Sequence, residues 1–242
     1  MPERRIGLAR MLSKLGYCSR SRAFALIRAG KVSLNRNVTR NPEAPVREAQ
    51  DHIAVNGKPL ATAEKIYLML NKPRGIVTTA SDEQGRETVY SLLPSDLPWL
   101  APVGRLDKAS EGLLLLTNDS IWAARITDPR SHVDKTYHVQ IAAIPDEQLL
   151  AKLIKGLRSG GELLKVKSAS ILRSGQKNSW LEIVLDEGRN RQIRRIFDGL
   201  GIGVLRLVRV AIGPLQLGDL AKGAHRHLQP DETTHLSRPS AK

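Results

Sequence analysis

The stretch of this 242-residue chain that decides its fold is Val103-Gly-Arg-Leu-Asp-Lys-Ala-Ser-Glu-Gly-Leu-Leu-Leu-Leu-Thr-Asn-Asp119. Residues 112–117 form a short apolar run, which is typical of a strand buried on both faces of a sheet. A Gly-Arg-Leu-Asp turn precedes this run and places the carboxylate of Asp107 just ahead of the strand. Aspartates in such positions often satisfy free backbone amides. The spacing alone therefore predicts a buried strand with a polar turn before it.

The sequence on either side of this stretch alternates strand-like runs with occasional helices. Regular strand–helix–strand alternation is absent, so we expect an α+β fold with a mixed, largely antiparallel sheet and not a doubly wound one. Residues 145–147, Pro-Asp-Glu, are expected to open a helix with proline in its first turn. The other predicted elements are strands at 66–70, 76–79, 135–141 and 180–185, and a helix at 189–200 that buries Ile193, Ile196, Phe197 and Leu200.

Positive charge is concentrated at the N-terminus. The whole chain carries 38 Lys and Arg against 24 Asp and Glu, a net charge of +14, and residues 1–42 hold ten of these bases and one acid. Simple solvation of exposed helix faces is one explanation. Phosphate binding explains so lopsided a ratio better, because each cation that neutralises a phosphate releases a counterion. The candidate phosphate contacts are Arg20, Arg22 and Lys31.

The same N-terminal segment predicts two short helices followed by short strands. Four apolar residues share one helical face, Ser19 can cap the second helix, and Gly30 can end it. Strands are expected at 32–34 and 53–55, the latter followed by an Asn-Gly pair that favours a tight hairpin. The apolar residues of the first helix are Leu8, Met11, Leu12 and Leu15.

Two runs in this segment, Arg10-Met-Leu-Ser-Lys-Leu-Gly-Tyr-Cys-Ser-Arg-Ser-Arg-Ala23 and Ile27-Arg-Ala-Gly-Lys-Val-Ser-Leu-Asn35, resemble the small RNA-binding domain named for the S-four ribosomal protein. Arg36 stands where that domain usually has glycine, at the first turn of its strands. The resemblance implies binding to structured RNA. We expect an RNA-binding domain at 1–62, a second, larger domain at 63–229, and a polar, frayed tail at 230–242.

Several classes of protein and site are excluded by what the sequence lacks. A single cysteine, Cys18, rules out an intramolecular disulfide framework and a multi-cysteine metal site. No apolar run approaches 18 residues, there is no secretory h-region, and no helix opposes a basic face to a Trp/Phe-rich one. Neither a phosphate loop nor a full dinucleotide fingerprint is present, and His225-Arg-His227 is expected to be a solvated turn. We expect a cytoplasmic location, no membrane partner, no cofactor and no metal.

The stretch around Asp107 resembles the active-site signature of bacterial pseudouridine synthases, in particular the branch that modifies ribosomal RNA and carries the same N-terminal domain. Three further motifs of that family follow in order, so that the resemblance covers nearly all of residues 4–220. Ser110 and Ser120 depart from the usual threonine and glycine. The further motifs are Lys135-Thr-Tyr137, Glu187-Gly-Arg-Asn-Arg-Gln-Ile-Arg-Arg-Ile196 and Leu205-Arg-Leu-Val-Arg-Val-Ala-Ile-Gly-Pro-Leu215.

The resemblance implies an isomerisation that needs no cofactor: the glycosidic bond of a uridine breaks, the uracil turns, and its carbon-5 bonds to the sugar. Asp107 would be the essential carboxylate, acting either on the anomeric carbon or on the proton of the neighbouring carbon. Arg194 would pair with it and favour its ionised form. An ion pair with Asp198, four residues along an exposed helix, is the alternative for Arg194.

The remaining site residues follow from the same resemblance. Tyr137 would pack on the target base and handle the carbon-5 proton, and Leu207 would line the base pocket, although either could be an ordinary strand residue. Arg105 and Lys108 flank the aspartate and could hold the backbone of an extruded nucleotide. The expected partner is ribosomal RNA, with the large subunit favoured, and the expected state is a monomer. A non-catalytic ribosome assembly factor is the alternative function.

Overall fold

The computed structural model describes residues 5–61, 63–80 and 82–237. The chain forms two compact units. Unit one consists of Met1–Tyr67, Leu93–Ala101 and Leu116–Ser120, and unit two of Leu68–Leu92, Pro102–Leu115 and Ile121–Lys242. Among the described residues, every helix falls short of the length and apolar character that crossing a membrane requires.

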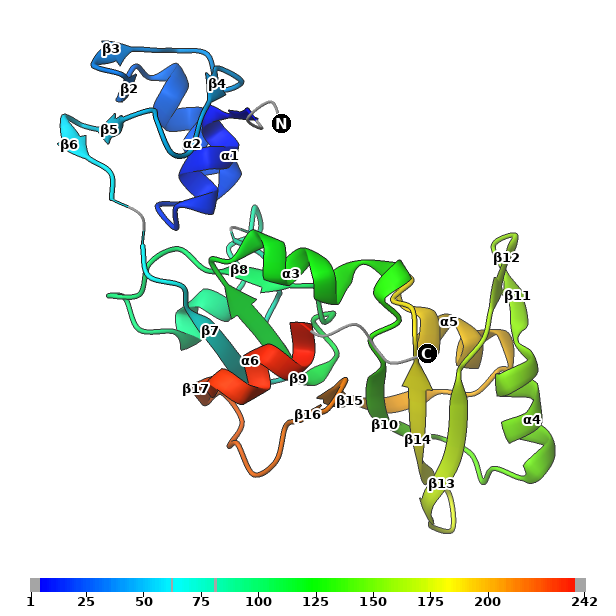
Figure 1. Cartoon of the computed structure of the whole chain (residues 1–242). Coiled ribbons are helices and arrows are strands. Elements are labelled where there is room, and N and C mark those ends of the chain that lie inside the picture. The colour runs from blue at the N-terminus through cyan, green and yellow to red at the C-terminus, as the bar shows by residue number, and fades with distance from the viewer. Residues whose placement is uncertain (1–4, 62, 81, 238–242) are drawn as a thin grey trace. The chain divides into compact units, whose positions relative to one another are not determined.

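The two helices predicted for the N-terminal segment are confirmed as α1 (Leu8–Lys14) and α2 (Arg20–Arg28) (Figure 1). The apolar face of α1 is buried in the core of the first unit. The side chain of Ser19 caps α2, because its hydroxyl oxygen accepts a hydrogen bond of 3.2 Å from the backbone N–H of Arg22. Capping and apolar spacing were therefore sufficient signals for both helices.

The strands of the first unit form a four-stranded sheet in the order β3-β2-β5-β6, beside a separate β1–β4 pair. The first turn adopts positive φ without glycine, at Asn35 (50°) and Arg36 (70°). Asn35 holds it in place, because its side-chain amide donates to Asp51 and its oxygen accepts from the backbone of His52, both at 2.9 Å. The strands are β1 (Ile6–Gly7), β2 (Val32–Leu34), β3 (Asn37–Val38), β4 (Pro45–Val46), β5 (Ile53–Val55) and β6 (Lys58–Pro59).

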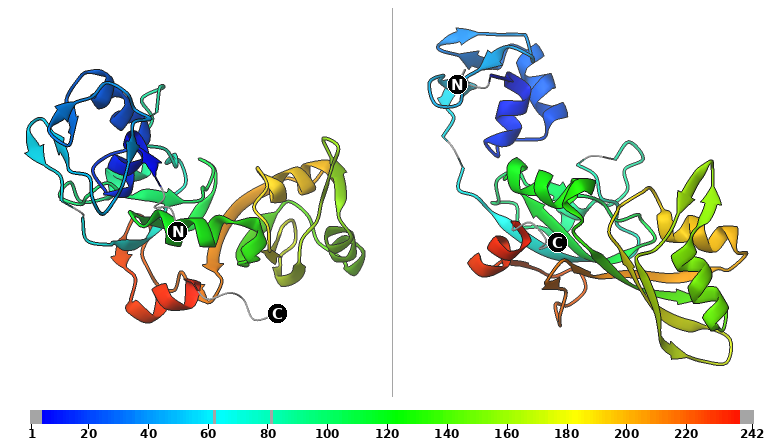
Figure 2. Two further views of the ribbon diagram at one scale, coloured as in Figure 1. Left: turned by 45° about the horizontal axis from the view of Figure 1, so that its top comes forward. Right: turned by 45° about the vertical axis from the view of Figure 1, so that its right-hand side comes forward.

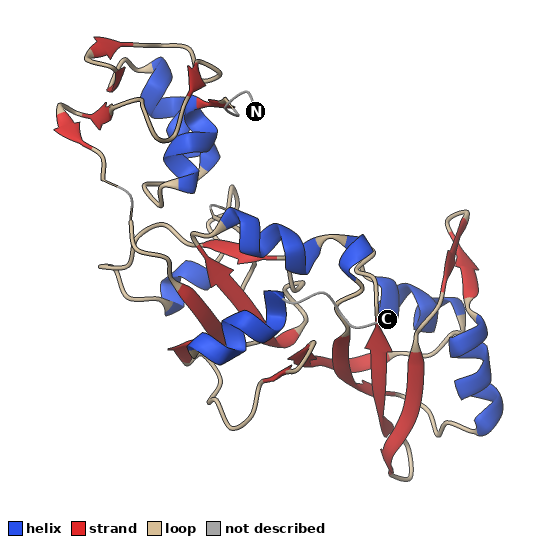
Figure 3. Ribbon diagram, viewed as in Figure 1, coloured by secondary structure: helices blue, strands red, loops and turns tan. Residues whose placement is uncertain are grey.

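A nine-stranded mixed sheet carries the rest of the chain, in the order β13-β14-β10-β15-β9-β7-β17, with β16 on β15 and β8 on β9 (Figure 3). The pairs β13–β14, β14–β10, β10–β15 and β7–β17 are antiparallel, and β9 runs parallel to β15. The expected α+β class with a largely antiparallel sheet is confirmed. The strands are β7 (Tyr67–Lys72), β8 (Ala101–Val103), β9 (Glu111–Thr117), β10 (Lys135–Ile141), β13 (Ser168–Ser174), β14 (Ser179–Leu185), β15 (Val204–Ile212), β16 (Leu215–Gln216) and β17 (His225–His227).

Every residue of β9 is buried, as the apolar run predicts. The helices α4 (Glu147–Lys155) and α5 (Gln192–Gly199) pack on one face of the strands β10 and β14, where Val139, Leu181 and Phe197 meet in one core (Figure 2). The other elements are α3 (Ser120–Thr127), α6 (Pro230–Ser237), the short helices η1 (Val89–Leu92) and η2 (Pro129–Ser131), and the hairpin of β11 (Leu157–Ser159) and β12 (Glu162–Leu164).

Three predictions of local structure are wrong. The strand expected at 76–79 is a loop with an isolated bridge between Val77 and Thr88. The helix expected to contain Pro145 in its first turn is capped by the side chain of Asp146, and the proline lies before the cap. The histidine pair at 225–227 is not a turn, because it forms β17 and completes the edge of the sheet against β7.

The tail predicted to be frayed is also ordered over most of its length. Residues Pro230–Ser237 form α6, with Leu236 only 3% exposed. The indole N–H of Trp122 donates to the carbonyl of Thr233 at 3.0 Å, which ties this helix to α3. The polar composition of this segment gave no sign that Leu236 is buried and that the helix packs on the fold through it. Residues 238–242, the rest of the predicted tail, lie outside the described residues.

Candidate active site

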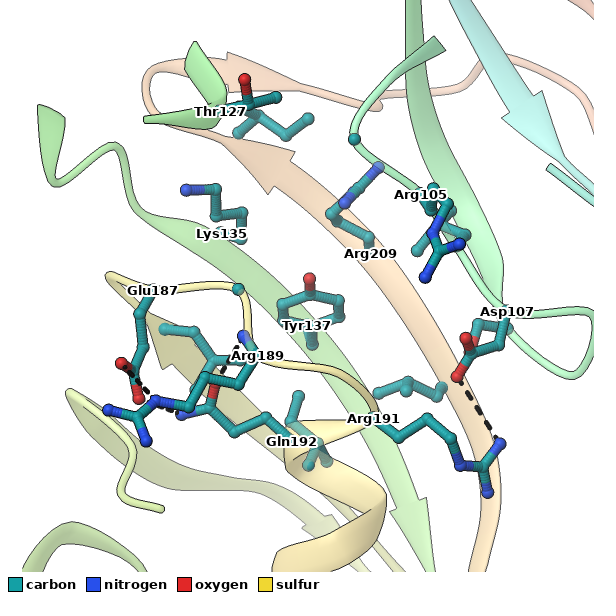
Figure 4. A pocket seen from close by; sticks show the side chains of 18 of the residues that line it. Arg105, Asp107, Thr127, Lys135, Tyr137, Glu187, Arg189, Arg191, Gln192 and Arg209 are labelled. Carbon is teal, nitrogen blue, oxygen red and sulfur yellow. Dashed lines mark hydrogen bonds and ion pairs between the residues drawn. The ribbon is translucent and has the colours of Figure 1, made fainter. Parts of the chain in front are cut away.

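Asp107 lies in the loop between β8 and β9, at the wall of a cavity of about 450 Å³. Tyr137 from β10 and Arg105 from the same loop line this cavity with it (Figure 4). Leu207 from β15 is also part of the cavity wall. The structure thus brings four of the predicted site residues together around a space large enough for one nucleoside. Lys108, which was predicted beside them, is not part of the cavity wall.

The backbone of the Asp107 loop is held by a buried lysine that sequence reasoning missed. Lys72, at the end of β7, is 0% exposed. Its ammonium donates to the carbonyls of Asp107 at 3.2 Å, Ser110 at 2.9 Å and Pro73 at 3.0 Å. Burial lowers the pKa of Lys72 to about 8, against the raising effect of the nearby Asp107 and Glu111 carboxylates. The only signal in the sequence was a lysine that ends a strongly apolar strand.

The ion partner of Asp107 is Arg191 and not the predicted Arg194. An Nη1 atom of Arg191 lies 3.6 Å from Oδ2 of Asp107, and the two side chains are 48% and 35% exposed. Helix α5 begins only at Gln192, so Arg191 occupies its N-cap with a left-handed backbone (φ 48°, ψ 32°). The sequence pattern placed the start of this helix at residue 189, which hid the turn that directs Arg191 toward the carboxylate.

Arg194 lies close by but holds backbone. Its Nη2 donates to the carbonyl of Ala109 at 3.0 Å and its Nη1 to that of Val204 at 3.4 Å. Within the described part of the chain, it forms an ion pair neither with Asp107 nor with the alternative partner Asp198. Burial lowers the pKa of Arg194, and the positive charge of Arg191 lowers it further. Together, Lys72 and Arg194 hold the backbone carbonyls of Asp107, Ala109 and Ser110 in this loop.

The motif at residues 187–196 forms another wall of the cavity, and its side chains are hydrogen-bonded to one another (Figure 4). Gln192 is buried, and its amide N–H groups donate to Glu187 at 2.7 Å and to the carbonyl of Lys165 at 2.9 Å. Its amide oxygen accepts from the backbone of Arg189 at 3.2 Å, and the Arg189 side chain donates to Glu187 at 2.9 Å. These contacts hold the turn that leads to Arg191.

One side of the cavity is built by the neighbouring strands β10 and β15. Tyr137 of β10 stands opposite Arg209 of β15, and Leu207, which is 7% exposed, stands opposite Val139. Lys135 precedes Tyr137 by two residues and lines the same cavity. Sequence reasoning missed both Lys135 and Arg209 as wall residues, although each lay within a motif that it had identified.

The predicted phosphate contacts belong to the first unit. Arg20 and Arg22 are exposed in the first turn of α2, and Lys31 is exposed just before β2. Nothing in their surroundings neutralises them, since no ion pair joins any of the three to another described residue. Over the described residues, His, Cys, Asp and Glu side chains also form no group of three or more that could hold a metal ion.

Comparison with known proteins matches both parts of the chain. Residues 66–198 match the family model for RNA pseudouridylate synthase, and residues 6–53 match the S4 domain. The chain is 36% identical over 231 residues to a Bacillus subtilis protein named ribosomal large subunit pseudouridine synthase B, covering 95% of this chain and 94% of that one. It is 37% identical over 232 residues to an uncharacterized RNA pseudouridine synthase of Aquifex aeolicus, covering 96% and 93%.

A solved structure agrees with these matches. A crystal structure of a pseudouridylate synthase superposes with a TM-score of 0.68 at 32% identity, covering 96% of this chain and 99% of that chain. The match therefore extends over both the N-terminal domain and the mixed sheet that carries the cavity. The chain belongs to the RNA pseudouridine synthase family, as an isomerase with an N-terminal RNA-binding S4 domain.

Proposed function

We propose that this enzyme converts a specific uridine of ribosomal RNA to pseudouridine, and that the RNA belongs to the large subunit. The ribosomal target is supported by the name of the Bacillus subtilis relative, which matches nearly the whole chain. The observation that supports the site assignment is the single cavity that Asp107, Tyr137 and Leu207 all line. The proposal includes a monomeric enzyme that acts in the cytoplasm without a cofactor.

Asp107 is the proposed essential carboxylate. The carbon–nitrogen bond of the uridine breaks, and either the carboxylate bonds to the anomeric carbon or it removes the proton of the neighbouring carbon. Both roles need an ionised oxygen directed at the sugar. The loop backbone held by Lys72 and Arg194 is proposed to provide the direction, and the Arg191 guanidinium lies beside the carboxylate at 3.6 Å.

Tyr137 and Leu207 are proposed to receive the base. An aromatic ring and an apolar side chain on adjacent strands provide a flat surface on which a uracil can pack and turn. The tyrosine hydroxyl is proposed to exchange the carbon-5 proton. Arg105, at the wall of the same cavity, is proposed to hold the RNA backbone displaced when the nucleotide leaves its stack, and Lys108 is proposed to act outside the cavity.

The N-terminal domain, residues 1–62, is proposed to supply affinity, and the catalytic domain, residues 63–229, the chemistry. Arg20, Arg22 and Lys31 are free to meet phosphates on structured RNA. Such contacts position an RNA without reading its sequence. The choice of uridine must then depend on the shape of the RNA and on the walls of the cavity.

Tritium release tests the substrate. Large-subunit and small-subunit ribosomal RNA, each labelled at uridine carbon-5 and freed of protein, are incubated separately with the pure enzyme. We expect release from large-subunit RNA alone, at one mapped position. Release from small-subunit RNA alone would contradict the choice of subunit. Silence on both RNAs, and on the assembled and precursor particles, with RNA binding intact, would favour the assembly-factor alternative.

A further inference from the structure

Two cations stand at the side of the cavity occupied by Tyr137. Lys135 lies two residues before Tyr137 on β10, so both side chains point to the same face of the sheet. Arg209 of β15 stands directly opposite Tyr137, and all three line the cavity. In Figure 4 the Tyr137 hydroxyl points into the region between Lys135 and Arg209, whereas Asp107 and Arg191 lie on the other side of the ring.

Arg209 retains an unused donor in this wall. Its side chain is buried, with the residue only 5% exposed, and its Nε donates to the carbonyl of Leu113 at 2.7 Å. Its Nη2 is buried and has no hydrogen-bond partner among the described residues. A buried donor without a partner is costly, so its presence in a cavity wall points to a ligand that supplies an acceptor.

Lys135 is likewise not neutralised. Its side-chain ammonium forms no hydrogen bond or ion pair with any residue that the structure describes, and the acids that act on its charge have partners of their own. Asp134 pairs with Lys167 at 2.7 Å, and Asp186 faces His132 at 3.8 Å. Burial lowers the pKa of Lys135, and the charge of Arg209 lowers it further, against the raising effect of Asp134 and Asp186.

The chemistry of the substrate says what these cations would meet. If Asp107 faces the sugar, the base extends away from it past Tyr137, and the groups at the far edge of a uracil are its carbonyl oxygens and the N3–H. When the bond between N1 and the anomeric carbon breaks, its electron pair stays on the uracil. The negative charge then spreads over N1 and the two carbonyl oxygens, which are acceptors for an ammonium or a guanidinium group.

We infer that Lys135 and Arg209 form the base-side end of the active site, where they donate to the uracil oxygens and hold the negative charge of the detached base. This inference rests on the proposed function. The charge disappears when carbon-5 bonds to the anomeric carbon, its proton leaves, and N1 takes up a proton, so the product is an isomer of the substrate. Because the charge exists only after bond cleavage, these contacts stabilise the transition state more than they stabilise bound RNA.

Lys135 is the residue to vary, because Arg209 also ties β15 to β9 through the carbonyl of Leu113. Lys135→Met removes the charge and keeps the length, and Lys135→Arg keeps the charge. Lys177→Met is the matched control, since Lys177 is exposed in the turn between β13 and β14 and lies outside the cavity. Single-turnover rate, RNA affinity and thermal unfolding are measured for each variant on a ribosomal RNA that the wild type modifies.

For Lys135→Met we expect a single-turnover rate about 100-fold below wild type, RNA affinity within about threefold, and partial recovery in Lys135→Arg. The control should match wild type in all three measurements. A normal rate in a folded Lys135→Met protein would overturn this inference and leave the proposed function intact. A loss that lies wholly in RNA affinity would also overturn it. A wild-type enzyme that turns over no RNA would overturn both.

Discussion

Asp107 lies in a loop whose backbone carbonyls accept hydrogen bonds from the side chains of Lys72 and Arg194. The carboxylate of Asp107 is partly exposed and forms an ion pair with Arg191. Lys72 and Arg194 bind the backbone of the loop and not the carboxylate, so they hold Asp107 in position without pairing with its charge. The two arginines therefore have different tasks, and substitution can separate them.

Arg191→Met and Arg194→Met should differ in the free energy of unfolding that they lose. The Arg191 pair is half-exposed, so its loss changes the free energy of unfolding by at most about 1 kcal/mol while turnover falls. Loss of Arg194 leaves the partly buried carbonyls of Ala109 and Val204 without this donor and lowers the unfolding free energy by about 1–3 kcal/mol. Urea unfolding and single-turnover rates measure both effects. A larger loss of stability in Arg191→Met than in Arg194→Met would contradict this division.

Four residues that the motif resemblance singled out, Arg105, Asp107, Tyr137 and Leu207, line one cavity, but the resemblance did not give the ion partner of Asp107. The partner depends on where α5 begins, and the apolar spacing of residues 193–200 is compatible with a start at 189 or at 192. Likewise, a lysine at the end of an apolar strand has no sequence signature that tells which carbonyls it meets. Such pairings are set by tertiary geometry and could not be read from the chain.

At the scale of elements, β9 depends on one glycine for its contact with β15. Gly112 has φ +100°, and a Cβ built on it would lie 2.2 Å from the carbonyl oxygen and 2.8 Å from the nitrogen of Arg209. No side chain fits between these two backbones. The close approach also places Arg209, which lines the cavity, next to the strand that follows Asp107.

Gly112→Ala should therefore cost at least about 3 kcal/mol of unfolding free energy, because it forces backbone apart in the centre of the sheet. Gly199→Ala is the control, since that glycine lies at the end of α5 with open space around it and no positive φ. Urea unfolding of the two variants gives the comparison. Equal stability in Gly112→Ala and Gly199→Ala would show that β9 and β15 do not approach as described.

Glu111 begins β9 and couples its stability to pH. Burial raises the pKa of Glu111, but hydrogen bonds and charges from Arg206 (3.0 and 3.2 Å) and Lys222 (2.7 Å) lower it below its ordinary value overall. A carboxyl whose pKa is lower in the folded state stabilises the fold above its ordinary pKa of 4.5 and loses that contribution as the pH falls.

Glu111→Gln should accordingly lower the unfolding free energy at pH 7 by about 1–3 kcal/mol and flatten its decline at acid pH. The measurement is urea unfolding of wild type and variant from pH 7 down to pH 3. The two curves should converge below pH 4.5. A constant difference across the whole range would contradict the role of Glu111 as an ionised partner of Arg206 and Lys222.

At the scale of the whole molecule, positive charge is concentrated in residues 1–42, whereas the cavity with Asp107 lies in the second unit. In the N-terminal part, the two helices and the strands at 32–34 and 53–55 were predictable, because α2 has a serine cap, α1 has an apolar face, and the turns contain Asn35 or Asn56. The strands β1, β3, β4 and β6 were not predicted, because each has only two residues. The larger sheet was predictable in class but not in detail. The loop at 76–79 and the helix at 230–237 depend on long-range contacts, such as that of Trp122 with Thr233, that leave no local pattern.

If the N-terminal cations supply RNA affinity, the salt-dependent part of this affinity can be removed without changing the turnover rate. Replacing Arg20, Arg22 and Lys31 together by Met should reduce the slope of log Kd against log salt by about 2. The rate at saturating RNA should stay unchanged. Lys152, Lys155 and Lys177, exposed on the catalytic side, provide the matched triple control. An equal loss of slope in the control would mean that RNA affinity is spread over the whole surface.

The most direct test of the account compares wild type with Asp107→Asn on one labelled ribosomal RNA, with tritium release and RNA binding measured on the same protein samples. The amide keeps the shape of the side chain and leaves the loop contacts of Lys72 and Arg194 in place. We predict full release by the wild type, none by the variant, and equal RNA affinity and salt dependence for the two. Substantial release by a pure Asp107→Asn protein would contradict the assignment of this carboxylate.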